Sequence, residues 1–434
     1  MDNRSLLVKA EAVTAARHYD IDARPPFIVQ KAQGAWLEDC DGRTLLDMTS
    51  SNGTTLFGYR RAEIDKAIEE QVTQRGLMFP TTLSPQRIAL AERLVDRYAA
   101  AEKALFFRTG SEGTSAAIRL VRAYTGRRVI LSSGYHGWHD WHRGFRQVCW
   151  DAQNEVFHFS YSLEALTHLL EQGRGAIAGV IVTPEPGWYS ADDFRAMSRL
   201  CAQAGVPFIL DEVMSGLRYG PAGLNGAGVP ADLLVICKGL ANGMALSSVA
   251  GKADIIDAYD AAGLAGTYNK EVTPMAVALT ALDLLEDGTL HRSAQAIGAA
   301  LMNELQQQAD EAGIPLWVTG APLMFKTVFG SEALGDAVGQ ACFEHGLFLE
   351  CNGTHMINFA FGEREKDHAV AAFAQALREV VVSGAADGLV GTRIVSEQRK
   401  AYARRALGAG FEDDDIDVPM AHGVAALKKY LHAS

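Results

Sequence analysis

The sequence predicts an α/β fold with a large, mainly parallel β-sheet and a smaller second domain, and two observations support this prediction. Through the central third of the chain, short apolar runs alternate with longer segments whose apolar residues recur at helical spacing, which is typical of a parallel sheet covered by helices. The chain also has 434 residues, more than a single core usually organises.

Five apolar runs are the expected strands of the large sheet, and segments of helical pattern lie between them. The runs span residues 104–107, 129–131, 180–182, 208–210 and 233–236. The expected helices span residues 115–124, 163–172 and 193–204. Because ligands bind an open parallel sheet at the carboxyl ends of its strands, the residues that follow these runs are the first candidates for a site.

The remaining sequence is expected to form an α+β domain from both chain ends. We expect an N-terminal segment that packs with the small domain (1–60), a large domain (61–290) and a C-terminal small domain (291–434). The predicted elements outside the large domain are a hairpin of residues 27–29 and 35–37 with an Asp-Gly turn signal after it, apolar runs at 316–319, 324–328 and 356–360, and a terminal helix at 423–432.

Composition and charge exclude several classes of protein. The formal net charge of −12 disfavours nucleic-acid binding, which needs clustered cations. No segment approaches the run of about 20 apolar residues that spans a membrane, so we expect a soluble, cytoplasmic protein. The six cysteines lack paired CxxC spacing and the density of a disulfide scaffold, so reduced thiols are expected.

Small polar residues follow the first predicted strand of the large sheet. Thr109-Gly110-Ser111 stand between this strand and a helix, where backbone N–H groups, a hydroxyl and the positive helix end favour a phosphate. Residues of this type also cap helices for structural reasons. The tripeptide alone is therefore weak evidence for anion binding.

An amine and a carboxylate follow two other predicted strands. Lys238 follows the run 233–236 and precedes a glycine-rich loop, where loss of hydration would make its neutral amine a nucleophile for an aldehyde. A lysine that merely ends a strand is the commoner case. Asp211 changes this balance, because a carboxylate at an adjacent strand end can bind a protonated pyridine nitrogen. Tyr135 could stack on such a ring, with Val213 on its opposite face.

Several motifs in one order resemble class III aminotransferases of fold type I, and most closely the glutamate-1-semialdehyde aminomutase subgroup. The resemblance covers residues from about 27 to 361. The motifs that carry it are RTGSEGTSAAIRLVRAYTGR (108–127), GYHGWHD (134–140), LDEVMSGLRYG (210–220), CKGLANGM (237–244) and GTYNKEVTPMAVAL (266–279).

The resemblance implies a pyridoxal 5'-phosphate enzyme in which an amino group moves from an amino donor to a carbonyl acceptor. It implies that Gly110 and Ser111 hold the phosphate, that Tyr135 stacks on the ring, that Asp211 binds the ring nitrogen and that Lys238 forms the Schiff base. It further implies a homodimer with shared active sites, in which Thr267 reaches the phosphate of the neighbouring subunit.

The segments expected to line the substrate pocket depart from the subgroup. Asn52, Glu185 and Trp188 are the substrate-contact candidates, and their segments carry hydroxyls, indoles and a carboxylate but no arginine. This mixture suits an amino sugar or aminocyclitol, as in aminoglycoside biosynthesis, better than a dicarboxylic acid. Three arginines elsewhere could still receive a donor carboxylate, and these are Arg24, Arg143 and Arg146.

Two other functions remain open from the sequence. A 2,1-aminomutase or an epimerase would use the same lysine and aspartate, whereas a non-catalytic pyridoxal-phosphate-binding protein would leave them idle. His136, His139 and His142 raise the question of a metal site, but no carboxylate or cysteine completes a ligand set. We therefore expect no metal, a polar pocket lining for His136, and ordinary packing or exposure for the other two histidines.

Overall fold

The computed structural model describes residues 1–14, 27–76, 78–142, 155–350, 353–386 and 427. The chain divides into two compact units. One unit contains Met1–Asp65 together with the chain from Asp287 onward through the last described helix, and the other contains Lys66–Glu286. The predicted terminal helix at 423–432 and the three arginines Arg24, Arg143 and Arg146 lie outside the described residues.

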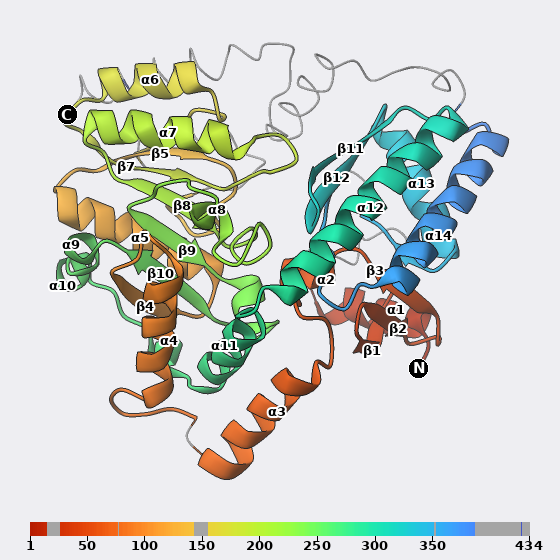
Figure 1. Cartoon of the computed structure of the whole chain (residues 1–434), viewed down its shortest axis with the longest axis horizontal. Helices are drawn as coiled ribbons and strands as arrows, with labels where there is room; N and C mark the ends of the chain where they lie inside the picture. Colours follow the sequence, from red (N-terminus) through yellow and green to blue (C-terminus); the bar gives the residue numbers. More distant parts are fainter. Residues whose placement is uncertain (15–26, 77, 143–154, 351–352, 387–426, 428–434) are drawn as a thin grey trace. The chain divides into compact units, whose positions relative to one another are not determined.

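The second unit is built on a seven-stranded sheet in the order β4-β10-β9-β8-β7-β5-β6 (Figure 1). Its strands are β4 (Lys103–Phe107), β5 (Val129–Ser133), β6 (Val156–His158), β7 (Ile177–Val182), β8 (Phe208–Glu212), β9 (Leu233–Ile236) and β10 (Ser247–Gly251). The neighbours from β9 through β8, β7 and β5 to β6 are parallel, whereas β10 is antiparallel to both β9 and β4.

Helices cover both faces of this sheet, with α6 and α7 on one face and α5 on the other (Figure 1). The helices of this unit are η2 (Gln71–Arg75), α4 (Pro85–Arg97), α5 (Gly110–Thr125), α6 (Leu163–Gln172), α7 (Ala191–Ala204), α8 (Gly223–Gly226), η3 (Lys238–Ala241), α9 (Ala253–Ile256), α10 (Tyr259–Ala262), η4 (Thr267–Lys270) and α11 (Thr273–Leu284). Helix α3 (Ala62–Glu70) spans the boundary between the units.

Local sequence explains where α5 and α7 begin and end. Thr109 and Glu112 form a reciprocal capping box at the start of α5, and Ser190 and Asp193 form one at the start of α7. Both helices end at a glycine in the left-handed conformation, with φ of 66° at the end of α5 and 64° at the end of α7.

Close packing sets α5 against the centre of the sheet. A Cβ on Gly113 would come within 2.8 Å of Val235 on β9, so a larger residue would push the helix away from the strand. The surrounding core consists of buried aliphatic side chains from α5 and the strands. This packing fixes the amino end of α5, where the phosphate is expected, relative to the carboxyl end of β9.

The first unit draws its elements from both chain ends. Strands from each end share a sheet of order β1-β2-β3-β13, in which Leu347 of β13 pairs with Leu46 of β3. The elements are α1 (Asn3–Val13), β1 (Val29–Gln33), β2 (Trp36–Asp39), β3 (Thr44–Asp47), α2 (Ser50–Gly53), α12 (Thr289–Ala312), β11 (Leu316–Ala321), β12 (Met324–Phe329), α13 (Glu332–Glu344), β13 (Leu347–Phe348), β14 (Thr354–His355) and α14 (Glu363–Val382). The predicted α/β class with a smaller α+β part is confirmed.

All five strands predicted for the large sheet are present, but three local expectations differ from the structure. The run 356–360 is not a strand, because the short strand β14 ends at His355 and a turn follows. The N-terminal hairpin consists of β1 and β2, which lie slightly later in the chain than the predicted runs 27–29 and 35–37. The Asp41-Gly42 turn joins β2 to β3. Strand β10 was not predicted, since Ser247-Ser248 interrupt its apolar pattern.

Candidate active site

The predicted site residues of the second unit lie at the carboxyl ends of neighbouring strands. Lys238 follows β9, where it begins the 3₁₀ helix η3 with φ of 42°, a left-handed conformation that is strained for a residue with a Cβ. Asp211 lies at the end of the adjacent strand β8, opposite Val235 of β9. Sheet register therefore brings the amine and the carboxylate to one rim.

The surroundings of Lys238 favour a neutral amine. Burial lowers the pKa of Lys238, and the charge of Arg218 lowers it further, while Cys237 and Asp211 oppose the shift. A lysine with a depressed pKa is a better nucleophile at neutral pH, because a larger fraction of it is unprotonated. This environment suits covalent bonding to an aldehyde.

Asp211 is buried and held in place by three hydrogen-bonding groups. Its Oδ2 lies 2.8 Å from Nδ1 of His136 and 3.1 Å from Oγ1 of Thr183, whose single hydroxyl hydrogen is shared with the Tyr135 carbonyl, and its Oδ1 accepts a 3.2 Å bond from the backbone N–H of Val213. Thr183 also lies 3.0 Å from Nδ1 of His136. These contacts fix the direction of the carboxylate.

The expected phosphate loop forms the amino end of the long helix α5. Thr109 is its N-cap, and the Glu112 carboxylate accepts the backbone N–H groups of Arg108 (2.8 Å) and Thr109 (2.9 Å). Gly137 has φ of 94°, and a Cβ there would come within 2.2 Å of the Ser111 hydroxyl. Only glycine lets the loop after β5 approach Ser111 this closely.

The two residues expected to flank the cofactor ring occupy the same rim. A Cβ on Gly110 would come within 2.8 Å of Val213, so the phosphate loop packs directly on this valine. Tyr135 lies after β5, and its carbonyl accepts a 2.8 Å bond from Thr183. Burial and the charge of Asp211 raise the pKa of the Tyr135 phenol, which places Tyr135 near the carboxylate.

Glu185 and Trp188 follow β7 on this rim, where a turn connects them. Glu185 is buried, Trp188 is half-buried, and the Glu185 carbonyl accepts the Trp188 backbone N–H at 2.9 Å. Tyr161 links this turn to the rest of the site. Its hydroxyl donates to the Thr183 carbonyl at 2.8 Å, and the charges of Glu185 and Asp211 add to burial in raising the pKa of its phenol.

Two predicted contact residues belong to other segments of the chain. Asn52 belongs to the first unit and has φ of 54°, within a run of three left-handed residues that begins at Ser50. Thr267 begins η4 and is exposed on the second unit. The roles of both residues remain predictions.

The three clustered histidines do not lie on a helix and do not form a metal site. His139 accepts or donates a 2.7 Å bond with Ser115, and His142 is fully buried rather than exposed. Within the described ranges, no group of three or more histidine, cysteine or acidic side chains is placed to hold a metal ion.

Sequence reasoning missed Arg218, Thr183 and Tyr161. Arg218 is buried near Lys238, although the segments considered for the pocket contained no arginine. The sequence contained an indication of this burial, because an arginine within the largely apolar stretch LDEVMSGLRYG has little access to solvent. Thr183 directly follows β7, but a threonine there is too common to be singled out.

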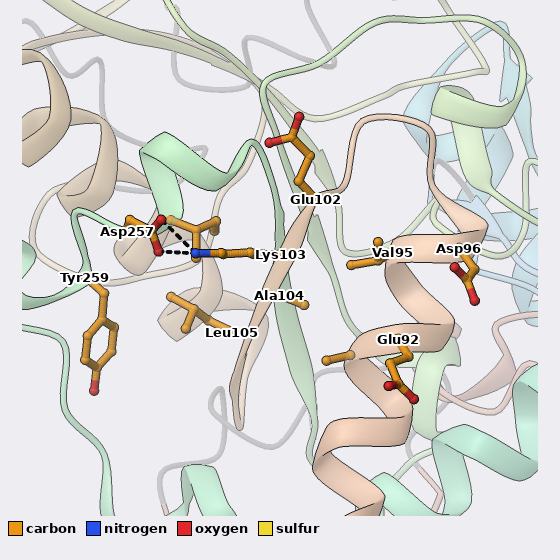
Figure 2. A pocket seen from close by; sticks show the side chains of 11 residues that line it. Glu92, Val95, Asp96, Glu102, Lys103, Ala104, Leu105, Asp257 and Tyr259 are labelled. Atoms are coloured by element: carbon orange, nitrogen blue, oxygen red, sulfur yellow. Dashed lines mark hydrogen bonds and ion pairs between the residues drawn. The ribbon is translucent and has the colours of Figure 1, made fainter.

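A cavity of about 800 Å³ lies elsewhere on the second unit, beside the start of β4 (Figure 2). Its lining residues are Ala91, Glu92, Val95, Asp96, Glu102, Lys103, Ala104, Leu105, Ile256, Asp257 and Tyr259. Figure 2 shows Lys103 and Asp257 joined across it, with Nζ at 2.6 and 2.7 Å from the two carboxylate oxygens. None of the predicted site residues borders this cavity.

The residues of the rim fit pyridoxal phosphate. A half-buried amine with a lowered pKa, an oriented carboxylate and a helix amino end lie at the ends of strands of one sheet, and Val213 packs against the phosphate loop. This set can bond an aldehyde, pair with a pyridine nitrogen and receive a phosphate.

The comparisons with known proteins agree with this chemistry. The family model described as aminotransferase class-III matches residues 18–381. The 2'-deamino-2'-hydroxyneamine transaminase of Streptomyces kanamyceticus is 33% identical over 86% of this chain and 96% of the relative. A glutamate-1-semialdehyde 2,1-aminomutase of Sulfolobus acidocaldarius is 30% identical over 72% of this chain and 80% of the relative.

A solved structure with a similar fold is the pyridoxal-phosphate internal aldimine form of the FumI protein of Sphingopyxis sp. MTA144. It has a TM-score of 0.82 and 26% identity, and the match covers 89% of this chain and 98% of that chain. Among the described helices of the present structure, none is both long and apolar enough to cross a membrane.

Proposed function

This chain belongs to the class III aminotransferases, and its cofactor is pyridoxal 5'-phosphate; we propose that it moves an amino group to or from an amino sugar or aminocyclitol. The observation that carries the catalytic part is that Lys238, half-buried and with a lowered pKa, and the buried Asp211 lie at adjacent strand ends. The substrate class is supported by the 33% identity to a transaminase named for an aminoglycoside precursor and by the composition of the turn that follows β7.

Lys238 has two tasks in the proposed reaction. Its amine would hold the cofactor covalently and, when free, would accept and return a proton as the general base of the site. The low pKa that results from burial serves both tasks, because each begins with an unprotonated amine. Pyridoxal phosphate, when bound, supplies the electrophilic carbon and an electron-withdrawing ring.

Asp211 would pair with the protonated nitrogen of that ring. The carboxylate is buried, and its bonds to His136, Thr183 and Val213 leave it little freedom to turn away. Gly110 and Ser111 at the start of α5 would receive the phosphate, with Tyr135 and Val213 on the two ring faces. These assignments rest on the family resemblance and on the shared rim.

The substrate proposal rests on side chains around the turn after β7. Trp188 offers an indole face of the kind that packs on the C–H surface of a sugar ring, and the buried Glu185 carboxylate can pair with an ammonium group. The buried Arg218 can receive the carboxylate of an amino-acid donor. One side of the exchange would thus be a sugar-like ring and the other an ordinary amino acid.

We also propose that the protein is a homodimer with shared active sites, as the resemblance implies. Exposed aromatic side chains support this proposal, since Phe79 is 40% and Tyr268 is 63% exposed while their rings lie 5.3 Å apart. Leu83 and Ile88 add exposed apolar surface in the same stretch of the chain. Thr267, next to Tyr268, would then contact the phosphate of the neighbouring subunit.

Steady-state kinetics with three substrate classes test the substrate proposal. Amino sugars and aminocyclitols should give a higher kcat/KM than glutamate-1-semialdehyde or simple ω-amino acids when each is offered with the same keto acid. A clear preference for either carboxylate-bearing class would overturn the substrate class while leaving the aminotransferase assignment intact.

One relative is an aminomutase, so an intramolecular transfer of the amino group is the alternative reaction to test. A single-turnover experiment without a keto acceptor separates the reactions, because an aminotransferase stops with the cofactor in its amine form. An aminomutase or an epimerase continues to turn over and returns the cofactor to its starting absorbance. Continued turnover would contradict the proposed transfer between two substrates.

A further inference from the structure

The turn between β6 and α6 places a tyrosine in a strained backbone conformation. Its central residues are Ser160 and Tyr161, whose φ angles are 46° and 58°. The Ser162 N–H closes the turn by donating to the Phe159 carbonyl at 2.9 Å. Two successive left-handed positions in a turn normally carry glycine, asparagine or aspartate, because a bulky side chain is unfavourable there. Such strain is typical of positions whose side chain has a task.

The Tyr161 side chain and backbone connect the carboxyl ends of two neighbouring strands. The side chain is buried, and its hydroxyl donates at 2.8 Å to the carbonyl of Thr183, which directly follows β7. The backbone N–H of Tyr161 donates at 2.9 Å to Oγ of Ser133, the last residue of β5. Burial and the charge of Glu185 raise the pKa of the phenol, so the hydroxyl remains a donor at neutral pH.

The Tyr161 ring also packs on the turn that follows β7. It stacks on the ring of Tyr189, with 4.5 Å between centroids and 19° between planes, and the ring of Phe194 lies edge-on to both. The Glu185 carbonyl accepts the backbone N–H groups of Trp188 (2.9 Å) and Tyr189 (3.0 Å). The stack therefore supports the turn that bears both proposed substrate contacts of this unit.

On its other side, Tyr161 lies against the loop that bears Tyr135. Gly134 has φ of 103°, and a Cβ there would overlap the Tyr161 hydroxyl and come within 2.8 Å of Thr183. The carbonyl of the next residue, Tyr135, lies 2.8 Å from the Thr183 hydroxyl. One buried side chain thus contacts both the loop expected at the cofactor ring and the turn expected at the substrate.

We propose that Tyr161 is a positioning residue for substrate selection, which holds the turn of Glu185 and Trp188 in one geometry relative to the loop of Tyr135. The proposal rests on the proposed function, because it takes the turn to contact the substrate and Tyr135 to contact the cofactor ring. It assigns a task to a residue outside both segments. The ring supports the turn, and the hydroxyl connects the ring to the strand end.

A tyrosine that only fills space would give a different result when it is replaced. Its loss would lower the stability of the protein without changing which substrate is preferred. Loss of a positioning residue lets the turn adopt several geometries, and the substrate that depends most on Glu185 and Trp188 is then affected most. Discrimination between an amino sugar and a small ω-amino acid is therefore the property to measure.

Fluorine NMR of the apoprotein labelled with 5-fluorotryptophan tests the geometry of the turn without cofactor or substrate. The Trp188 signal, assigned by its absence in Trp188→Phe, should be single and narrow in the wild-type protein. Tyr161→Leu should broaden or split this signal, and Tyr161→Phe should change it less because the stack remains. Tyr189→Leu should act like Tyr161→Leu, whereas Tyr189→Phe should keep the wild-type signal.

Tyr98→Phe is the matched control for the loss of a buried phenol. Tyr98 is also a buried tyrosine, but its hydroxyl has no hydrogen-bond partner among the residues that the structure describes. This variant should leave the Trp188 signal unchanged.

Steady-state kinetics of the holoenzyme provide the second readout, with glucosamine and β-alanine as alternative amino donors to one keto acid. In Tyr161→Leu, the ratio of kcat/KM for glucosamine to that for β-alanine should fall about tenfold, mainly through a higher KM for glucosamine. Tyr161→Phe should lower the ratio less, and Tyr98→Phe should leave it at the wild-type value.

The outcomes separate failure of this proposal from failure of the proposed function. An unchanged Trp188 signal in both Tyr161→Leu and Tyr189→Leu would overturn the proposal, and so would an altered signal with an unaltered kcat/KM ratio. If Tyr161→Leu does not fold, Tyr161→Phe and Tyr189→Leu provide the same test. A wild-type preference for β-alanine would instead overturn the proposed substrate class, while the fluorine signals would still decide whether Tyr161 positions the turn.

Discussion

The two ends of strand β4 carry very different groups of charges. Its carboxyl end lies on the rim where β8 and β9 also end, with Asp211 buried and Lys238 half-buried, and the ionisable groups of this rim influence one another. At its amino end, the cavity of Figure 2 contains Lys103 and Asp257, whose side chains are 48% and 60% exposed and simply pair. Both ends offer a lysine and an aspartate at the margin of one sheet.

The difference shows that residue type and position on a sheet are not sufficient to make a lysine and an aspartate reactive. Water solvates the Lys103–Asp257 pair, and an exposed ion pair of this kind contributes little. Lys238 has lost that water, so its protonation depends on Arg218, Cys237 and Asp211. Burial together with specific neighbours distinguishes the reactive end from the other.

The largest expected effect comes from removing the buried amine. Lys238→Ala should leave a folded protein that binds pyridoxal phosphate without a covalent bond and has almost no transamination activity, because no other group can replace the amine as base. Lys103→Ala, at the exposed end, should retain full activity. Borohydride reduction followed by peptide mapping gives an independent check, and a label on any other lysine would contradict the assignment.

The carboxylates should differ in the same way. Asp211→Asn keeps the shape of the side chain but removes its charge. The variant should lose several kcal/mol of transition-state stabilisation, which lowers the rate on the order of a thousandfold. Asp257→Asn should change kcat by less than about twofold, since its partner is exposed. Near-normal turnover in the Asp211 variant would show that this carboxylate does not face the ring nitrogen.

A smaller effect is expected at the proposed subunit boundary. Thr267→Ala should weaken cofactor binding by about 1.5 to 3 kcal/mol, the usual value of a hydrogen bond to a charged group, without blocking dimer assembly. Cofactor titration and analytical ultracentrifugation measure the two properties. Thr280→Ala, on helix α11, is a matched control, because the Thr280 hydroxyl only bonds to the Ala276 carbonyl of its own helix.

The smallest expected effect concerns the pH dependence of stability. Burial raises the pKa of Glu212 to about 7, although the backbone N–H groups of Leu224 and Asn225 and the Ser215 hydroxyl oppose this shift. A raised pKa in the folded state means that its contribution to stability is fully present below the ordinary value of 4.5 and is lost as pH rises through about 7.

Glu212→Gln should therefore flatten the fall in apoprotein Tm between about pH 5 and about pH 8. The single amide oxygen can replace Oε2 as acceptor for the Leu224 N–H and the Ser215 hydroxyl, whereas the Asn225 N–H loses its acceptor Oε1, so the test compares the slope of Tm with pH and not the absolute Tm. Glu92→Gln, an exposed change at the cavity of Figure 2, should leave the slope as it is. An equal slope in the wild-type and Glu212→Gln proteins would show that Glu212 does not titrate in this range.

The sequence alone predicted the parallel strands well, and the reason is physical. Buried strands such as β7 and β9 consist almost entirely of aliphatic residues, so their pattern is unmistakable. It also identified the cofactor, because Lys238 and Asp211 occur within long specific motifs. In contrast, β10 carries two buried serines, and its place between β4 and β9 follows from long-range pairing that local patterns do not contain.

Contacts between side chains from different strands could not be predicted in the same way. The rings of His136, His142 and His158 lie 5.0 and 5.6 Å apart between successive centroids, an arrangement that forms only when β5 and β6 pair. The effect of Arg218 on the pKa of Lys238 likewise depends on burial that three-dimensional packing creates. Ordinary packing or exposure was expected for His142, and the structure buries it. The sequence motifs indicated the residues expected to contact the cofactor, but not the neighbouring side chains that set the environment of those residues.

The position of β10 also has a consequence for biosynthesis. β4 joins the sheet only through β10, whose Ser247 pairs with Phe107 and whose Ser248 pairs with Ile236. A nascent chain that has emerged only through Lys238 already contains α5 and β9, which pack on each other, but β4 still lacks its neighbour in the sheet. Before Gly251 has left the ribosome, the unpaired edges of β4 and β9 are therefore surfaces for chaperones to protect.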